Sequence, residues 1–495
     1  MKTKPKILFW INSVFFHYSL PYYLQSKLDV DFFGIAEINE KPRNFIENQK
    51  LVNFEKIWYF HDYIKKDSSK IDLDYLANFE NSYKINLWKL ALNERFFYEH
   101  NRFYQFKKNE ILFILEQELK LFETILDEVK PDFFLAYDPV YHHQKLLLDM
   151  CKKKGIKILS IYLTGIEDKL IIGENGSTLD LDSNSLENLI ENSTSKSNND
   201  KKNYDTVINS YLQDKTPKFS NKIKALTSYL SNDDSELVKT NYMYYGRSKF
   251  KVIKDTINFE LNKKKRFSFL QKTSLLSPPL DIPYVYFPMN VNEEMNILHY
   301  APYFTNQIEV IRHIAKSIPI DYLLYVKDHI AAEMRGWNKI NYYKEIMEIP
   351  NVKLIHPYFD NNILLKNSQL LISVRGTTAY KAVKYSKPSI IFGDQPIEII
   401  PSVFKVNSLL DLPNLIYKAL KLKVDPTYFE KYKTLIDTKS IKFNMFNYEN
   451  LRNSAFFAGG ILSNVEIHEK NMLDFLKKNE NMFSILVNNH IKLLS

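Results

Sequence analysis

Short apolar runs alternate with longer helix-periodic segments along the first third of the chain. Lys6 to Ile11 and Val30 to Ile35 are apolar runs typical of buried strands, whereas Asn109 to Val129 repeats its apolar residues at helical spacing. This predicted helix ends at Lys130-Pro131-Asp132, a helix stop that precedes the apolar strand FFLAY. Strands that alternate with helices of this length indicate a parallel sheet, covered on both faces, within residues 5–165.

The same alternation returns after a proline-rich run. The segment SPPLDIP, Ser277 to Pro283, excludes a helix and suits a linker between domains. Beyond it the predicted strands are YVYFPM, DYLLYVK, NVKLI, LLISV and SIIFG, with predicted helices between them. Two such α/β units joined by a hinge would form a cleft between the carboxyl ends of two sheets, which is the expected ligand site.

The middle and the end of the chain have a different character. Residues 174–203 are rich in Ser, Asn, Asp and Lys, as is typical of a loop, whereas 204–272 regain helical periodicity. We therefore predict an α/β protein in three parts. They are an N-terminal domain at 1–276 with a helical insertion at about 174–272, a C-terminal domain at 277–438, and a helical tail at 439–495 that crosses back to the N-terminal domain.

Composition narrows the class of protein. The chain has 495 residues, more than one hydrophobic core usually organises, and its 45% hydrophobic content excludes a mostly disordered chain. Its single cysteine, Cys151, excludes an internal disulfide and a multi-cysteine metal site, and fits a reducing compartment. The N-terminal run KILFWINSVFF is interrupted by Asn12 and Ser13, so it reads as a strand rather than a signal sequence.

The net charge of +9 favours an anionic partner. Lysines are mixed with acidic residues, as in LDEVK and KKDSSKIDLD, so most of them read as solvated helix faces and no nucleic-acid partner is expected. The remaining bias favours a phosphate-bearing ligand and contact with acidic lipid. No segment offers the roughly 18 uninterrupted apolar residues that span a bilayer, so we expect a cytoplasmic protein in peripheral contact with the inner face of the membrane.

The turn Arg375-Gly376-Thr377-Thr378 points most directly at chemistry. It follows the predicted strand LLISV, so it would lie at the carboxyl edge of the second sheet, at the start of a helix where phosphate can sit. Gly376 permits a backbone conformation closed to other residues, the threonines can cap the helix or bind phosphate oxygens, and Arg375 supplies a forked cation. The alternative is an ordinary helix cap beside a surface arginine.

Two further groups would share this edge. Lys327 and His329 end the strand DYLLYVK, where they could neutralise a diphosphate or a leaving nucleotide, and the alternative is a solvated loop. Glu293 and Glu294 follow YVYFPM, where one carboxylate could orient a sugar hydroxyl or act as a base, and the alternative is a favourable helix start. Glu293, Glu294 and His329 are therefore the candidate catalytic residues.

Polar residues also follow the predicted strands of the first half. The candidates for acceptor binding are Ser13, His17, Asp138 and His142, and simple helix capping is an equal alternative for the histidines. His142 and its neighbour His143 invite a metal, but adjacent histidines point to different sides and no Asp, Glu or His partner lies at ligand spacing. We therefore predict no metal site.

No dinucleotide turn G-x-G-x-x-G, phosphate loop G-x-x-x-x-G-K-[ST] or nucleophile turn G-x-S-x-G occurs, which weakens dehydrogenase, NTPase and hydrolase interpretations. The chain instead resembles the capsule and surface polysaccharide biosynthesis glycosyltransferases, the broad family that includes Kdo transferases of capsule assembly. The resemblance covers most of the chain. It is carried by NERFFYEHNRFYQFKKNEIL with LDEVKPDFFLAYD, by YVYFPMNVNEE, by IAKSIPIDYLLYVKDH, and by NVKLIHPYFDNNILLKNSQLLISVRGTTAYKAVKYSKPSIIFGD.

This resemblance implies a GT-B fold, in which two Rossmann-like domains face a cleft and the C-terminal domain binds most of the nucleotide sugar. It implies donor contacts from Lys327, His329 and the turn Gly376-Thr377-Thr378. Two positions depart from the family pattern, because Ile330 replaces a proline and Lys381 replaces an acidic residue that looks like a ribose binder. Either Lys381 reaches phosphate instead, or the donor site has decayed.

The resulting hypothesis is a metal-independent glycosyltransferase without a cofactor, which uses a CMP-, UDP- or GDP-sugar and a glycan or lipid-linked acceptor. One alternative is a CDP-glycerol-type polyol-phosphate transferase, since the same turn would serve that leaving group. Another is a catalytically silent nucleotide- or glycan-binding partner of an assembly complex, which Lys381 and Ile330 favour.

Overall fold

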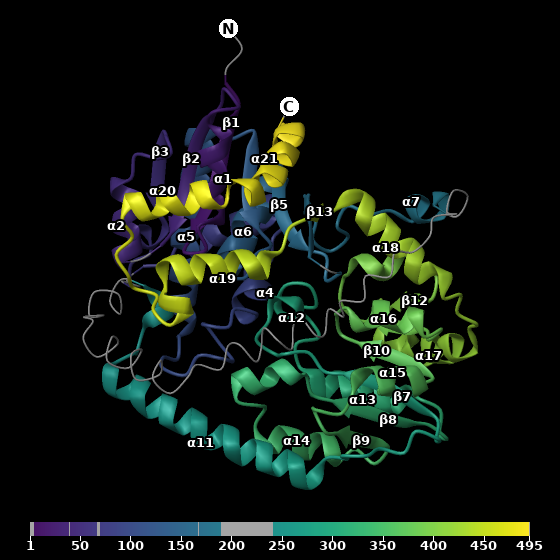
Figure 1. Cartoon of the computed structure of the whole chain (residues 1–495). Helices are drawn as coiled ribbons and strands as arrows, with labels where there is room; N and C mark the ends of the chain where they lie inside the picture. The colour runs from purple at the N-terminus through teal and green to yellow at the C-terminus, as the bar shows by residue number, and fades with distance from the viewer. Residues whose placement is uncertain (1–3, 39, 67–69, 167, 190–240, 495) are drawn as a thin grey trace. The chain divides into compact units, whose positions relative to one another are not determined.

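The chain forms two compact units, each built around its own β-sheet (Figure 1). The computed structural model describes residues 4–38, 40–66, 70–166, 168–189 and 241–494. The first unit contains the described residues of Met1–Glu174, Lys201–Lys249 and Ser440–Ser495, and the second those of Asn175–Asp200 and Phe250–Lys439. Most of the predicted helical insertion lies outside the described residues, at 190–240.

The first sheet has seven strands in the order β13-β6-β5-β4-β1-β2-β3. Their bounds are β1 Lys6–Asn12, β2 Asp31–Glu37, β3 Lys56–Tyr59, β4 Phe133–Tyr137, β5 Lys157–Leu163, β6 Lys169–Gly173 and β13 Ile441–Lys442. Strands β1 to β5 pair in parallel, whereas β6 pairs antiparallel with β5 and with β13. The N-terminal apolar run is therefore an interior strand of a largely parallel sheet, as its unbroken hydrophobicity predicts.

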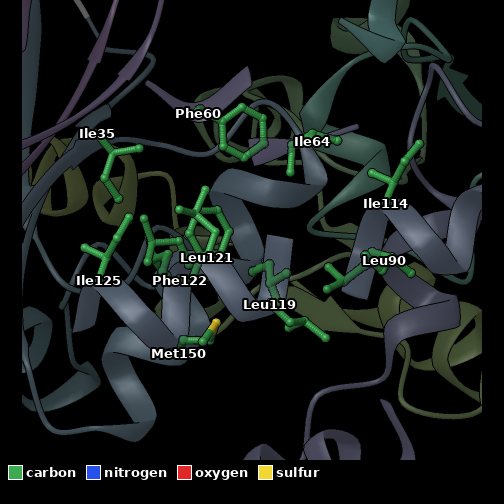
Figure 2. Packing of buried hydrophobic residues seen from close by; sticks show 14 of the residues in the cluster. Ile35, Phe60, Ile64, Leu90, Ile114, Leu119, Leu121, Phe122, Ile125 and Met150 are labelled. Carbon is green, nitrogen blue, oxygen red and sulfur yellow. The ribbon is translucent and has the colours of Figure 1, made fainter. Parts of the chain in front are cut away.

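Successive residues of β1 point to opposite faces of the sheet, and each face is covered by its own hydrophobic core. Leu8 and Trp10 belong to a core that includes the apolar stripe of α5, part of which is seen in Figure 2. Ile7 and Phe9 belong to a second core that includes the C-terminal helices. The first unit's helices are α1 Phe16–Leu24, α2 Glu40–Asn48, α3 Leu73–Tyr83, α4 Leu87–Leu92, α5 Lys108–Val129, α6 His142–Lys153, α19 Met445–Phe456, α20 Glu469–Lys478 and α21 Glu480–Leu494, with short 3-10 turns at Phe60–Tyr63, Tyr242–Tyr244 and Ala458–Gly460.

The C-terminal segment returns to the first sheet. The Tyr23 hydroxyl of α1 donates to the carbonyl of Leu476 over 2.7 Å, and the Tyr448 hydroxyl donates to the carbonyl of Val14 over 2.8 Å. Phe483 of α21 packs against Tyr23 and Phe16. These contacts cover the Ile7 face of the sheet with residues from the end of the chain.

The second sheet has six strands in the order β12-β11-β10-β7-β8-β9, and every neighbouring pair is parallel. Their bounds are β7 Tyr284–Pro288, β8 Leu323–Lys327, β9 Val352–Ile355, β10 Leu370–Ser373, β11 Ser389–Ile391 and β12 Val403–Lys405. After β7, the strands β8 and β9 are added on one side of it in the sheet. The strands β10, β11 and β12 are then added on its other side. This is the doubly wound order, with its switch point between β7 and β10.

The interior strands β7, β8, β10 and β11 of this sheet are almost entirely buried, and the second unit also contains helices (Figure 1). Their bounds are α7 Ser183–Asn188, α11 Lys249–Thr273, α12 Met295–Leu298, α13 Gln307–Ser317, α14 Ile340–Met347, α15 Asn361–Asn367, α16 Thr378–Lys384, α17 Leu412–Lys421 and α18 Thr427–Lys439, with 3-10 turns at Ile330–Arg335, Pro396–Ile399 and Leu409–Asp411. The predicted α/β fold class with two Rossmann-like, parallel-sheet units is confirmed. Within the described residues, no helix combines the length and apolarity needed to cross a bilayer.

Candidate functional site

The predicted donor residues all follow strands that are neighbours at the switch point of the second sheet. Glu293 and Glu294 follow β7, Lys327 and His329 end or follow β8, and Arg375 begins the turn after β10. Because β10, β7 and β8 are adjacent and parallel, the loops that follow them emerge at the same edge. The fold thus brings together residues as distant in the sequence as Glu293 and Arg375, while their roles remain predictions.

The side-chain amides of half-buried Asn290 and buried Gln395 hold the peptide between Arg375 and Gly376. Asn290 Nδ2 donates to the Arg375 carbonyl over 2.6 Å, and the Gly376 amide donates to Gln395 Oε1 over 3.1 Å. Gly376 has a φ of 140°, a conformation that other residues rarely adopt, although the space around it would admit a side chain. Asn290 Oδ1 and Gln395 Nε2 are buried and have no hydrogen-bond partner among the described residues.

The Arg375 guanidinium is fixed by three neighbours. Its Nε donates to the Asp394 carbonyl over 2.9 Å, its Nη1 donates to Asn296 Oδ1, and its Cζ lies 3.9 Å from the centre of the Tyr300 ring. Thr377 precedes α16 and is exposed, but its side chain makes no capping hydrogen bond. Thr378 opens α16, and Lys381 is half-buried one turn later. The turn is therefore held by its surroundings, not by a threonine cap.

Lys327 and His329 have contrasting surroundings. Lys327 is buried and its ammonium donates to the Pro357 carbonyl over 2.7 Å. Burial lowers the pKa of Lys327 to about 8, against the opposing effect of Asp328 and Asp360. His329 is exposed, and its Nδ1 accepts the Ala331 amide over 3.1 Å at the start of the 3-10 turn that Ile330 opens. The His329 ring is therefore accessible at this edge, whereas Lys327 is buried.

A second group of amide side chains ties the β7 and β8 loops together, and sequence reasoning missed it. Gln307 is fully buried, accepts the Asn290 amide over 2.8 Å and donates to the Asn290 carbonyl over 2.9 Å and to Asn292 Oδ1. Asn292 donates to Asn338 over 3.0 Å, and Asn338 donates to the buried carboxylate of Asp328 over 3.0 Å. The available signal was a glutamine at the first turn of a helix whose other inward positions are apolar.

The two glutamates after β7 are half-buried. Glu293 lies 3.8 Å from Arg335, and Glu294 occupies the N-cap position of α12 without a side-chain capping bond. Glu294 therefore stands at a helix start, as the alternative interpretation expects, although its side chain makes no capping hydrogen bond. Both glutamates follow β7 at this edge of the sheet, and their catalytic role stays a prediction.

The predicted acceptor residues of the first unit differ in how far they are exposed to solvent. Ser13 is exposed, Asp138 is half-buried, and His17 is buried between aromatic rings, with the Tyr137 ring 4.6 Å away. Both ring nitrogens of His17 lack a hydrogen-bond partner among the described residues. Burial, together with the neighbouring His490, lowers the pKa of His17 to about 3, so the ring stays neutral.

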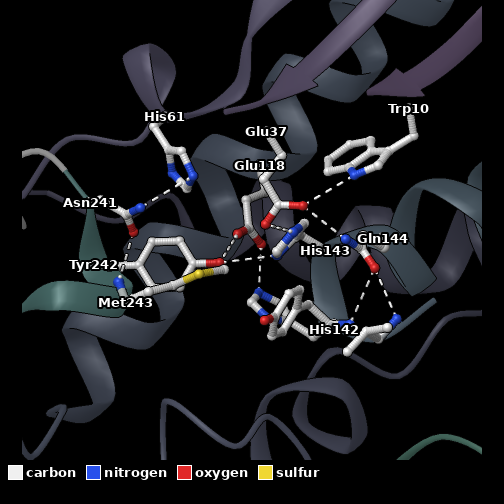
Figure 3. A network of polar contacts seen from close by, with 12 residues as sticks. Trp10, Glu37, His61, Glu118, His142, His143, Gln144, Asn241, Tyr242 and Met243 are labelled. Carbon is white, nitrogen blue, oxygen red and sulfur yellow. Dashed lines mark hydrogen bonds and ion pairs between the residues drawn. The ribbon is translucent and has the colours of Figure 1, made fainter. Parts of the chain in front are cut away.

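His142, the fourth acceptor candidate, lies in a buried polar network (Figure 3). Its Nδ1 is 2.8 Å from Glu94 and its Nε2 is 2.8 Å from Glu118. The adjacent His143 is turned by 85° relative to His142, with Nε2 3.1 Å from Glu37 and Nδ1 3.1 Å from the Tyr242 hydroxyl. Because its side chain is fully buried and both of its nitrogens are engaged, His142 does not present a free group to an acceptor in this structure.

The charges in this network stabilise one another. Burial by itself would lower the pKa of His142, but Glu118 and Glu94 raise it to about 10. Burial would likewise raise the pKa of Glu94, but its hydrogen bonds and charge interaction with His142 hold it at about 2. The neighbouring His143 and His61 and the hydrogen bond from Gln144 similarly lower the pKa of Glu37 despite its burial. His142 is therefore a buried cation between two carboxylates.

Among the described residues, one group could hold a metal ion: Glu118, His142 and His143, whose ligand atoms lie within 4.8 Å of one another. Carboxylate and imidazole ligands suit zinc, iron or manganese. The sequence argument against a metal considered only nearby positions, and it missed Glu118, which lies 24 residues before His142. A signal was present, because Glu118 interrupts the apolar stripe of α5 between Leu115 and Phe122. The ring nitrogens of both histidines are already engaged by Glu94, Glu118, Glu37 and Tyr242, so a metal would have to displace those contacts.

No protein-family model and no curated protein sequence matches the chain. Among solved structures, a UDP-GlcNAc 2-epimerase of Methanocaldococcus jannaschii, in complex with UDP-GlcNAc and UDP, is 13% identical, with 88% of this chain and 99% of that chain covered and a TM-score of 0.25. The β-Kdo 2,7 transferase KpsC of Thermosulfurimonas dismutans is 10% identical, with 70% and 87% covered and a TM-score of 0.28.

The N-terminal domain of a trehalose-6-phosphate phosphatase of Candida albicans is 13% identical, with 94% of this chain and 98% of that chain covered and a TM-score of 0.29. All three TM-scores lie below 0.5. The fold assignment therefore rests on the strand orders and pairings of the two sheets.

Proposed function

We propose that this protein is a glycosyltransferase that takes a sugar from a nucleotide-activated donor, CMP-, UDP- or GDP-linked, and transfers it to a surface glycan or a lipid-linked acceptor. One observation carries the proposal. At the switch point of the second sheet, Asn290 and Gln395 clamp the turn at Gly376, and each keeps one buried polar atom without a partner among the described residues. A buried polar atom left unpaired costs about 1–3 kcal/mol, so a polar ligand that supplies partners is favoured there.

The charges at this edge suit an activated sugar. When the glycosidic bond of the donor breaks, negative charge develops on the departing phosphate, and fixed cations stabilise it. Arg375 is held in one orientation by its neighbours, and Lys327 keeps its proton at pH 7 because its pKa of about 8 is still above that pH. The exposed His329 ring can contribute a hydrogen bond to the same group. Either Glu293 or Glu294 would take the proton of the acceptor hydroxyl.

In this proposal, side chains neutralise the charge of the departing phosphate. We therefore propose that the donor edge works without a metal. Turnover measured with a chelator should then equal turnover without it. A lipid-linked acceptor would bring the reaction to a membrane surface in the cytoplasm, and Ser13, His17, Asp138 and His142 remain the proposed acceptor residues, with the burial of His17 and His142 as the main obstacle.

Ligand binding is the first test. A thermal-shift screen with CMP, UDP, GDP, dTDP and CDP-glycerol identifies the donor nucleotide, because a ligand that binds only the native state raises the melting temperature. Replacing Gln395 by Met removes its Oε1 and Nε2 atoms and should abolish that shift in melting temperature. A shift that survives in the variant would place the nucleotide elsewhere.

Turnover is the second test. Lys327→Met and His329→Ala should each slow sugar transfer by about tenfold to a thousandfold. Lys316→Ala and His313→Ala are matched controls, because α13 ends at Ser317, just before the chain enters β8 at the opposite edge of the sheet. Normal rates in both site variants would refute the assignment, provided that their melting temperatures show that they are folded.

Product analysis separates the remaining candidates. A CDP-glycerol-type transferase would add phosphate to the acceptor, whereas a glycosyltransferase adds only the sugar. Lys381, half-buried on α16, favours a third reading, in which the chain is a silent nucleotide- or glycan-binding partner of an assembly complex. Tight nucleotide binding without turnover on any glycan or lipid-linked acceptor would support that reading.

A further inference from the structure

Helix α11 joins the second unit by one face. Arg266 donates to the carbonyls of Gly336 and Trp337 over 3.0 and 2.8 Å, and Leu270 is buried in a small core with Trp337. Lys263 pairs with Glu333 at 3.1 Å. These contacts fix the orientation of the helix and therefore decide which of its residues point outward.

The opposite face carries a stripe of exposed apolar side chains. Phe250, Ile257 and Leu261 are 76%, 56% and 62% exposed. They are seven and four residues apart, so at 3.6 residues per turn they fall within about 40° of one another and extend over about 16 Å. Single exposed apolar residues are ordinary, but three aligned on one helix form a contact surface.

Lysines border the stripe. Lys254, Lys264, Lys265 and Lys272 are exposed on the same side of α11, and none of them is paired with a carboxylate in the part of the chain that the structure describes. The helix as a whole has eight basic residues and two acidic ones, an excess of six within a chain whose net charge is +9. The excess of basic over acidic residues is therefore concentrated on this helix, although most of the chain's 67 basic residues lie elsewhere.

We infer that this outer face of α11, Phe250, Ile257 and Leu261 with the four lysines, docks the protein on a bilayer that contains anionic lipid. A helix with apolar residues flanked by lysines lies in the interface plane, with its apolar side chains at the boundary of headgroups and acyl chains. Each lysine near an anionic surface strengthens binding by about fivefold, which is the effect of about 1 kcal/mol. A nucleic acid would leave the apolar side chains against phosphates, so the charge and the stripe together favour lipid.

The inference goes beyond the proposed transferase activity and is tested without any nucleotide, so the failure of either does not decide the other. Flotation of the full-length protein with phosphatidylcholine vesicles, with and without phosphatidylglycerol, measures binding at low and high salt. The protein should bind only the anionic vesicles, and less at high salt because the charges are screened.

Two variants separate the contributions. Replacing Phe250, Ile257 and Leu261 by Ser should reduce binding at least tenfold. Replacing Lys254, Lys264 and Lys265 by Gln should reduce it about a hundredfold, from three factors of about five. The matched control replaces three other exposed apolar residues of the second unit, Tyr303, Ile320 and Leu410, by Ser, and it should bind as the wild type does.

Three outcomes would overturn the inference. Equal binding of the stripe variant and the control variant would show that the stripe does not touch lipid. A melting temperature lowered only in the stripe variant would show that another part of the chain covers the stripe. Self-association in sedimentation velocity, or vesicle-independent RNA binding, that the stripe variant abolishes would assign the face to a second copy or to nucleic acid.

Discussion

The buried cation at His142 makes the sharpest prediction about stability. Replacing His142 by Gln keeps a hydrogen-bond donor of similar size but removes the charge that lies 2.8 Å from both Glu94 and Glu118. The two carboxylates then remain buried without a counter-charge. Breaking a buried ion pair by removing one partner typically costs about 3–5 kcal/mol.

Proton linkage provides an independent magnitude. The pKa of His142 rises from its ordinary value of 6.5 to about 10 on folding. A raised pKa means that the folded state holds the proton more tightly, so the stabilisation is complete below pH 6.5 and is lost as the pH rises toward 10. At 1.36 kcal/mol per pH unit, the stabilisation at pH 7 is about 4 kcal/mol, in agreement with the ion-pair figure.

Urea unfolding measured through tryptophan fluorescence tests this prediction, because Trp10 contacts His143 in the same network. The wild-type first unit should lose about 4 kcal/mol of unfolding free energy between pH 7 and pH 10, and His142→Gln should be destabilised by about that amount at pH 7 and show no such loss. Adding Glu118→Gln to the variant should recover part of the stability. His490→Gln is the control, because burial lowers the pKa of His490 to about 4 and its charge plays no part at alkaline pH. A cost below about 1 kcal/mol, or an unchanged alkaline slope, would refute the buried cation.

Three further predictions concern single residues. The folded protein keeps His17 neutral, with a pKa of about 3, so its free energy of unfolding falls as the pH drops below 6.5. The free energy of unfolding of His17→Phe should therefore rise by about 2 kcal/mol relative to that of the wild type between pH 6.5 and pH 5. A difference in urea midpoints that does not change with pH would show that the ring is hydrated. Gly376→Ala places a side chain at a φ of 140° and should cost about 1–3 kcal/mol and weaken nucleotide binding. Gly155→Ala also places a side chain at a positive φ, but in the first unit, and should affect stability alone. Gln307→Ala leaves the Asn290 backbone unpaired, so it should raise the donor KM at least tenfold; an unchanged KM in a folded variant would show that the loop after β7 does not touch the donor.

The predicted βα alternation was confirmed in both units, down to the interior strands. Lys6–Asn12 and Leu370–Ser373 are buried on both faces, and an unbroken apolar run of this length is typical of such a strand. The turn at Gly376 was likewise identifiable, because a Gly next to hydroxyl residues directly after a buried strand has few other uses in this architecture.

Long-range partners could not be read from local patterns. The sequence separates Gln395 from Gly376 by 19 positions, Asn338 from Asp328 by 10 and Glu118 from His142 by 24, and nothing in the intervening residues indicates these pairs. For that reason the sequence predicts acceptor binding or helix capping for His142, whereas folding buries it between two glutamates. The outward direction of Phe250, Ile257 and Leu261 also depends on contacts at the other face of α11, at Arg266 and Leu270.

Hydrophobic periodicity thus determines which segments become strands and helices, since each residue's neighbours along the chain decide whether one face or both can be buried. The tertiary structure alone decides the order of strands in each sheet, and with it which loops meet at the switch point between β7 and β10. It also decides whether a charged side chain is exposed to solvent or lies next to a residue of opposite charge. The physical reason is that electrostatic and hydrogen-bond energies depend on distance and burial in space, which sequence separation does not measure.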